Sequence, residues 1–246
     1  MYKRMADFIT NNLELHAGDV ILEAGCGRGQ LTIPLTQKMV EIVKEFKVLA
    51  FDLYSGPYIG EQEALKKAIL KVGLEKFIVP ILGDVRNMKD IRNESVDVIV
   101  SNELFCDLNR KGLEQTIKEF CRILRSGGRM AHGNLSPVPE TPAQKLLIEA
   151  DAHSVNTTIP RPMWFSPSTD EVAALMHKHG FSNITVTYFE TNVQLPFDEA
   201  MKQLKKWNIN QEFIKHNTEE LKKHGLEFPI EPFVFCKKPL DKSLTN

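Results

Sequence analysis

Three glycines at alternate positions form the strongest chemical signal in this sequence. Gly25, Gly27 and Gly29 follow the apolar run 20–22 and precede an amphipathic stretch. Glycine is needed where the backbone takes unusual dihedral angles or lets a ligand approach closely. The start of a helix behind such a turn offers unpaired N–H groups to an anionic group. The pattern predicts a cofactor-binding turn between a strand and a helix.

Glu23 and Gln30 distinguish between the cofactors that this turn could hold. In the dinucleotide-binding pattern the third glycine is the sixth residue, whereas here it comes one residue early and Gln30 takes the sixth position. Glu23, just before the turn, would repel a pyrophosphate and would suit an ammonium group. The residues therefore argue against a nicotinamide or flavin site, and a nucleotide-cofactor oxidoreductase is kept as the alternative from another class.

The segment 23–29, EAGCGRG, resembles motif I of the class I S-adenosylmethionine-dependent methyltransferases. Further segments resemble the motifs of this family in the family's order, each at the end of a predicted strand. They are Asp52, Gly83-Asp84-Val85, the motif IV-like segment 96–102, and the turn 124–129, in which Ser126 replaces the usual proline. Several matches in order are far more specific than one glycine-rich turn. They cover roughly residues 19–134.

The resemblance implies S-adenosyl-L-methionine as cofactor and S-adenosyl-L-homocysteine as product. In this family the acid at Asp52 accepts hydrogen bonds from both ribose hydroxyls, and Asp84 with Val85 contacts adenine. Asp52 and Asp84 could instead be turn residues, and Cys26 is better explained as a small residue in a tight turn than as a nucleophile. The predicted cofactor-binding residues are Glu23, Gly25, Cys26, Gly27, Gly29, Gln30, Asp52, Leu53, Gly83, Asp84, Val85 and Asn102.

Candidate residues on the acceptor side also follow predicted strands. Glu103 is the predicted catalytic base or ammonium anchor, and a histidine satisfied within the sheet explains His132 at least as well as catalysis does. The segment 101–104, SNEL, is not the motif associated with methylation of planar amide or adenine nitrogens, and the absence of a Pro-Cys pair there disfavours 5-methylcytosine formation. The other candidates are Asp107 and Asn134, with Tyr2, Tyr54, Tyr58, Trp164 and Phe165 as possible covers of the pocket.

The elements that must position these residues alternate between short apolar runs and amphipathic stretches, which indicates βαβ units. We expect an α/β fold with a doubly wound, mostly parallel sheet and helices on both faces; the resemblance implies seven strands, the last near Val234 antiparallel. Strands are predicted at 20–22, 48–51, 77–82, 96–100, 129–132, 184–189 and 233–236. Helices are predicted at 3–15, 30–45, 61–72, 110–124, 143–152 and from Ser168 to Gly180.

The remaining segments predict a single domain, 1–246, with additions on the substrate side. The core is 19–134, the proline-punctuated stretch 135–167 is a substrate-side loop, and the charged stretch 197–224 is a small helical cap before the last strand. Ligands of open α/β sheets bind beyond the carboxyl ends of the strands. This is where Glu23, Asp52 and Asp84 fall.

The charge composition bears on the class of methyl acceptor. A formal charge of −1 over 246 residues argues against a nucleic-acid substrate, because phosphate binding favours a basic excess. A small-molecule acceptor is predicted first and a protein side chain second; a catalytically silent cofactor-binding module is a further alternative.

The four cysteines and scattered histidines indicate no metal site. No apolar run is long enough to cross a bilayer, and no signal core begins the chain, so a cytoplasmic protein is expected; the oligomeric state is left open.

Overall fold

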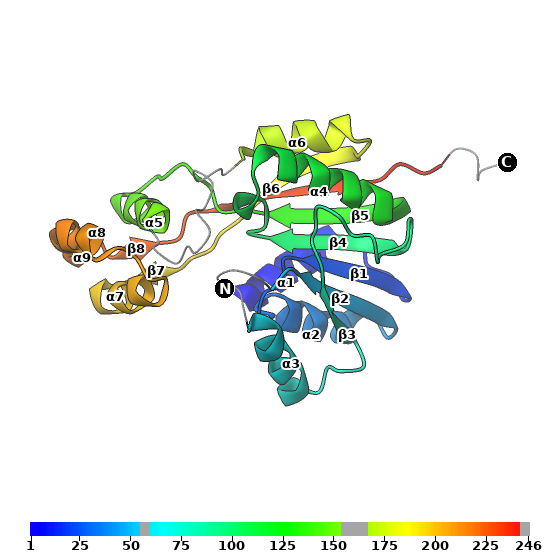
Figure 1. Ribbon diagram of the computed structural model, residues 1–246, viewed down its shortest axis with the longest axis horizontal. Coiled ribbons are helices and arrows are strands. Elements are labelled where there is room, and N and C mark those ends of the chain that lie inside the picture. The colour runs from blue at the N-terminus through cyan, green and yellow to red at the C-terminus, as the bar shows by residue number, and fades with distance from the viewer. Residues whose placement is uncertain (55–59, 154–166, 242–246) are drawn as a thin grey trace.

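A seven-stranded sheet organises the computed structural model, which describes residues 1–54, 60–153 and 167–241 (Figure 1). The strand order is β3-β2-β1-β4-β5-β9-β6. All neighbouring strands pair in parallel except β9, which is antiparallel to both β5 and β6. The strands are β1 (Asp19–Ala24), β2 (Phe46–Asp52), β3 (Ile78–Leu82), β4 (Val96–Asn102), β5 (Leu124–Gly133), β6 (Ser182–Phe189) and β9 (Glu231–Lys237).

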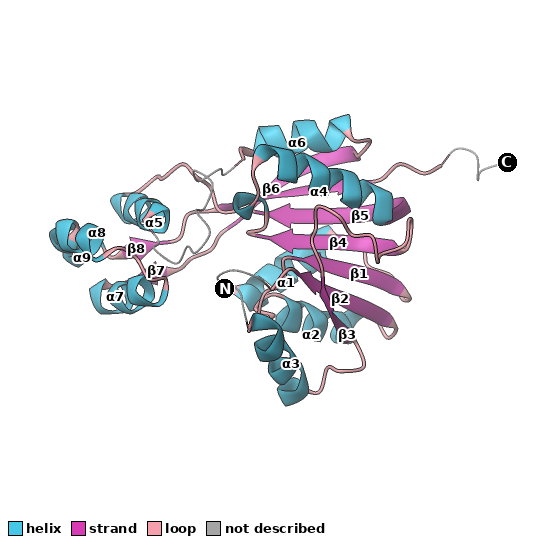
Figure 2. Ribbon diagram, viewed as in Figure 1, coloured by secondary structure: helices cyan, strands magenta, loops and turns pink. Residues whose placement is uncertain are grey.

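Helices cover both faces of this sheet, as Figure 2 shows. Side chains of α1 (Tyr2–Asn12), α2 (Thr32–Ile42) and α3 (Glu61–Val72) pack on one face, which we call the α1 face. Side chains of α4 (Arg110–Ile123) and α6 (Thr169–Lys178) pack on the opposite face. Because both faces are buried, the central strands read as continuous apolar runs. The prediction of a doubly wound α/β sheet with an antiparallel last strand is confirmed.

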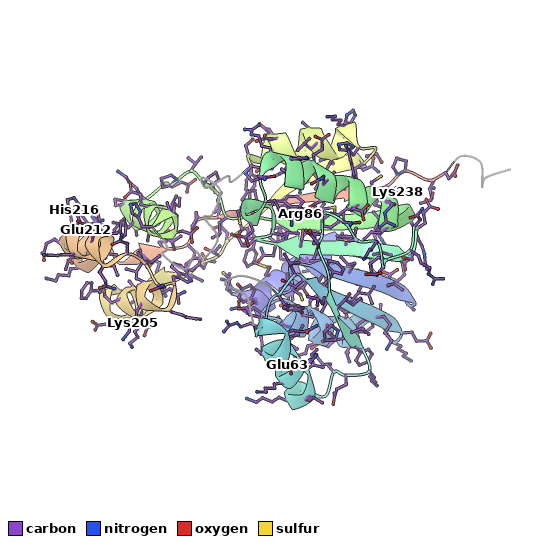
Figure 3. The ribbon with its side chains drawn as sticks, in the orientation of Figure 1. Glu63, Arg86, Lys205, Glu212, His216 and Lys238 are labelled. Atoms are coloured by element: carbon purple, nitrogen blue, oxygen red, sulfur yellow. The ribbon has the colours of Figure 1, made fainter. Side chains whose placement is uncertain are left out.

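A separate group of elements lies beyond the carboxyl ends of β4 and β5, and we call it the cap (Figure 1). It has its own apolar core, which includes Leu147, Leu204 and Leu221. Figure 3 places Lys238, directly after β9, on the side of the sheet away from the cap helices that carry Lys205, Glu212 and His216. The elements of the cap are α5 (Pro142–Ala152), α7 (Phe197–Lys206), α8 (Gln211–His216), α9 (Thr218–His224) and the strand pair β7 (Gln194–Leu195) and β8 (Leu226–Glu227).

Local signals placed several helix ends well. The predicted helix 61–72 coincides with α3, and Gly73 follows it with a φ of 70° that suits a glycine C-cap. Ser168 caps α6 by accepting a hydrogen bond from the Glu171 N–H. Long-range pairing decided other boundaries.

Four expectations about elements need correction. The helix expected at 30–45 spans Thr32–Ile42, and it begins late because the glycine turn continues through Leu31. The helix expected to run through residue 15 ends at Asn12. The strand at 129–132 is part of a longer β5, since β4 and β9 pair with it on both sides. The strands β7 and β8 were not predicted, because two residues each are too short to show a period.

The described part of the chain contains no helix long and apolar enough to cross a membrane. Its histidines, cysteines and carboxylates form no group of three or more that could hold a metal ion. The four cysteines are free thiols.

Candidate cofactor and acceptor site

A row of polar side chains runs along the carboxyl edge of the sheet on the α1 face. Residues on one face of a strand alternate, and the register across β2, β1, β4, β5 and β9 brings one residue of each strand to this edge. Glu23 and Glu231 are 208 positions apart in the sequence. They come together because β1 ends, and β9 begins, at the same edge of the sheet. In sheet order the residues at this edge are Asp52, Glu23, Asn102, Gly133 and Glu231, and all except Gly133 carry a polar side chain.

The glycine turn after β1 has the backbone that the sequence pattern requires. The φ angles are 78° at Gly25, 50° at Gly27 and 86° at Gly29, values that side chains rarely tolerate. At Gly29 a Cβ atom would also collide with the Leu65 side chain of α3. The turn therefore lies directly against the helix that follows β2.

Glu23 is buried at the start of this turn, with 3% of its surface exposed. Its Oε2 has no hydrogen-bond partner among the described residues. Burial raises the pKa of this carboxyl to about 8, the Thr32 hydroxyl lowers it, and the charge of Asp52 raises it further. A buried carboxylate without a partner costs several kcal/mol, so a cationic ligand group would stabilise this position strongly.

Asp52 joins the end of β2 to the glycine turn. Its Oδ2 accepts a hydrogen bond of 2.8 Å from the Gly27 N–H, and its Oδ1 accepts one of 3.0 Å from the Tyr54 N–H. The Tyr54 hydroxyl lies 3.1 Å from Cys26 Sγ. Burial and the Glu23 carboxylate raise the pKa of the Cys26 thiol, so this cysteine is not an activated nucleophile.

Asp84, just after β3, accepts several hydrogen bonds from the side chain and the backbone N–H of Arg86. The Arg86 Nη2 lies 2.6 Å from Asp84 Oδ2, and the Arg86 N–H donates to Asp84 Oδ1 over 2.8 Å. This arrangement lowers the pKa of Asp84, and Figure 3 shows Arg86 in front of the central strands. Next to it, Gly83 lies against the Phe51 ring and Val85 is buried.

Glu103 follows β4 in a left-handed conformation, with a φ of 52°. Its N–H donates to the Gly133 carbonyl over 3.0 Å, and its Oε1 accepts from the Leu135 N–H. Burial raises the pKa of the Glu103 carboxyl to about 7, the Leu135 N–H lowers it, and the charges of Asp107 and Asp151 raise it. Asp151 belongs to α5, so the cap contributes charge to the environment of Glu103.

Tyr2 on α1 lies near three carboxylates of this site. Burial raises the pKa of its phenol to about 12, with further contributions from Glu231, Glu103 and Glu23. Helix α1 therefore borders the site. Tyr2 is one of the aromatic residues predicted to cover the pocket.

His132 is a structural residue of the sheet. Its Nδ1 lies 2.8 Å from the Ser101 hydroxyl, and its ring stacks on Phe105 at a centroid distance of 3.6 Å. Burial lowers its pKa to about 3, so the ring is neutral. It points to the face opposite the row of polar side chains, since Met130 of the same strand packs there.

The remaining predicted residues divide into three groups. Gln30 and Leu53 are exposed beside the turn and β2. Asp107 and Asn134 lie close to Glu103, in η2 (Phe105–Asp107) and directly after β5. Tyr58, Trp164 and Phe165 lie outside the described residues.

Glu231 is a residue of this edge that the sequence prediction missed. It accepts a hydrogen bond from the Asn102 Nδ2, and only 1% of its surface is exposed. The prediction considered residues that follow strands, whereas Glu231 begins one. An acid at the start of an antiparallel last strand is the signal that could have indicated it.

Known proteins resemble the chain over this region. Residues 22–132 match the family model described as a methyltransferase domain. An uncharacterised methyltransferase of Schizosaccharomyces pombe, C70.08c, is 28% identical over 211 residues, which are 79% of this chain and 72% of that protein.

Solved structures share the fold at low identity. The YcgJ protein of Bacillus subtilis has a TM-score of 0.70 and 14% identity, covering 97% of this chain and 99% of that chain. A geranyl diphosphate methyltransferase crystallised with S-adenosylmethionine has a TM-score of 0.61 and 18% identity, covering 96% and 85%.

Proposed function

We propose that this chain is a class I S-adenosylmethionine-dependent methyltransferase that methylates a small organic acceptor at the carboxyl edge of its sheet. The observation that carries the proposal is the buried Glu23 side chain beside the glycine turn, whose Oε2 accepts no hydrogen bond from any residue that the structure describes. This is the position where a cofactor with a methionine ammonium group supplies the missing cation.

The hydrogen-bond acceptors at this edge fit the polar groups of S-adenosylmethionine. Glu23 would hold the ammonium group, Asp52 the ribose hydroxyls, and Asp84 with Val85 the adenine. The turn Gly25–Gly29 would lie against the methionine end. The oxygens of these acids are hydrogen-bond acceptors, as an ammonium, two hydroxyls and an amine require.

When bound, the cofactor supplies a methyl group that its sulfonium already activates toward nucleophiles. The task of this chain is to orient the acceptor, to exclude water and to manage one proton. Glu103 is proposed to accept the proton that the acceptor atom loses, because its carboxyl has a pKa of about 7 and lies next to Asn102. Tyr2 and the cap would close the site from solvent.

Two observations support a small molecule as the acceptor. The cap stands beyond the carboxyl ends of β4 and β5, where it can enclose a ligand (Figure 1). The structurally similar geranyl diphosphate methyltransferase acts on a small molecule, as its name states. A protein side chain is the second candidate. The single-domain organisation with segments 135–167 and 197–224 on the substrate side, and the cytoplasmic location, stay predictions.

Isothermal titration calorimetry tests the cofactor. S-adenosylmethionine and S-adenosylhomocysteine should both bind the full chain, NAD should not, and Asp52→Ala should bind both more weakly. Binding of NAD alone would contradict the proposal. A screen of tritiated methyl transfer from S-adenosylmethionine to amines, alcohols and peptides then identifies the acceptor.

A further inference from the structure

Glu231 reaches across a neighbouring strand to contact Asn102. Glu231 is the first residue of β9, and Asn102 is the last residue of β4, with β5 between these two strands in the sheet. Because β9 is antiparallel to β5, its first residue lies at the edge where β4 ends. The Glu231 Oε1 accepts a hydrogen bond from the Asn102 Nδ2.

Gly133 of β5 makes this contact possible. It pairs with Asn102 on one side and with Phe233 on the other. A Cβ atom at Gly133 would lie 2.6 Å from Glu231 Oε1 and would also collide with the Phe233 ring. Any side chain larger than hydrogen would therefore displace the Glu231 carboxylate. Because Gly133 has no side chain, the Glu231 side chain can cross β5 and contact β4.

The contact fixes which end of the Asn102 amide a ligand meets. The Glu231 Oε1 accepts from the Asn102 Nδ2, so the nitrogen of the amide faces Glu231 and its oxygen faces away from Glu231. The Asn102 Oδ1 has no hydrogen-bond partner among the described residues. Asn102 is only partly buried, so this oxygen can accept a hydrogen bond from a ligand.

The carboxyl groups around Asn102 favour the same kind of ligand. Glu103 is the next residue, and Glu231 lies on the other side of the amide. Over the described residues, no lysine, arginine or histidine forms an ion pair with either carboxylate. Burial raises the pKa of Glu231, and that of Glu103 to about 7. An anionic acceptor group would find no cation paired with these carboxyls in the described residues, whereas an N–H or O–H group would find an acceptor in Asn102 Oδ1.

We propose that Glu231 is a positioning residue that holds the Asn102 amide with its oxygen toward the ligand, so that the site takes methyl acceptors through an N–H or O–H group. The inference rests on the proposed function, because it assigns the acceptor chemistry of the same site. Glu231 acts through Asn102 and does not itself need to touch the acceptor.

The first test is direct observation of the Asn102 side-chain amide by NMR, with selective ¹⁵N-asparagine labelling and Asn102→Asp for assignment. The wild-type spectrum should contain one downfield, exchange-protected Nδ2 proton. Glu231→Leu should lose it, and Glu231→Gln should restore it, because the glutamine oxygen still accepts. Absence of such a proton from the wild-type spectrum would overturn the proposal even if Glu231→Leu does not fold.

Glu227→Gln provides a matched control. Glu227 lies in the cap, and its Oε1 accepts from the Gln144 side-chain nitrogen over 3.0 Å, so it is also a carboxylate bound to an amide. This variant should leave the Asn102 signal unchanged. A shift of the Asn102 signal in this control equal to that in Glu231→Leu would contradict a specific role for Glu231.

The second test compares sinefungin with S-adenosylhomocysteine by calorimetry. Sinefungin carries an amine where the transferable methyl group would be. The ratio of its affinity to that of S-adenosylhomocysteine therefore measures the hydrogen-bond acceptors that face the methyl acceptor. In Glu231→Leu this ratio should fall about tenfold, as expected for one hydrogen bond to a charged group, while S-adenosylhomocysteine still binds.

The two tests separate the inference from the proposed function. Failure of S-adenosylhomocysteine to bind the wild-type chain would refute the proposed function. Binding with an unchanged sinefungin ratio in Glu231→Leu would refute the inference alone.

Discussion

The carboxylate of Asp52 accepts a 2.8 Å hydrogen bond from the backbone N–H of Gly27. This bond joins the end of β2 to the glycine turn that follows β1, so the two halves of the proposed cofactor site form one unit. A substitution at Asp52 therefore removes both a ligand contact and a support of the turn.

We expect Asp52→Ala to weaken binding of S-adenosylhomocysteine by roughly 10- to 100-fold, the size of one or two hydrogen bonds to a charged group. Asp52→Asn should be intermediate, because the amide oxygen can still accept from the Gly27 N–H. Calorimetric dissociation constants measure both effects. Asp90→Ala, at an exposed acid in the loop before β4, is the control, and an Asp52→Ala affinity equal to that of this control would refute the assignment.

Binding of S-adenosylhomocysteine should release a proton from Glu23. In the free protein the pKa of this carboxyl is about 8, so the group is largely protonated at pH 7. An ammonium group beside it favours the carboxylate, and affinity should therefore rise as the pH rises toward 8. Calorimetry in buffers of different ionisation enthalpy measures the proton count. Glu23→Gln should bind more weakly and release no proton from this site; an unchanged proton count in that variant would exclude Glu23 as the source.

The rate of methyl transfer should rise with pH through about 7 and then level off, because a general base must be deprotonated and the pKa of Glu103 is about 7. Initial rates with the acceptor found by the screen, measured from pH 5.5 to 9 at saturating cofactor, test this. Glu103→Gln should lower kcat by roughly 10²- to 10⁴-fold and remove that limb of the profile. Equal kcat and the same profile in Glu103→Gln would show that the acceptor needs no base from this residue.

His132 should affect stability and not cofactor binding. The buried ring packs on Phe105 and Ser101, so His132→Ala should lower the free energy of unfolding by about 2–4 kcal/mol. Urea denaturation measures this loss, and S-adenosylhomocysteine affinity should stay unchanged. A large loss of affinity in a folded His132→Ala protein would return His132 to the candidate site residues.

The buried His132 ring should also make the folding stability depend on pH. Its pKa is about 3 in the folded protein and about 6.5 when unfolded. The unfolded chain thus binds the extra proton between these values, and stability falls as the pH drops below about 6.5. His132→Phe should reduce this part of the pH dependence.

The local sequence determined the βαβ order, the glycine turn and the acids at the ends of β1 and β2 and after β3. Apolar runs, helix caps and glycines with positive φ are properties of neighbouring residues, so they are visible without the fold. That is why α3 was predicted with its correct ends and why Glu23, Asp52 and Asp84 were found as candidates.

Only the tertiary structure decided how distant residues meet. Glu231 and Asn102 are 129 positions apart, and they meet because β9 runs antiparallel and brings its first residue to the edge where β4 ends. Helix α5 joins α7–α9 in the cap because their apolar faces share one core, although α6 and β6 separate them in sequence. Strand direction and shared burial depend on packing between remote segments, and no local period in the sequence records them.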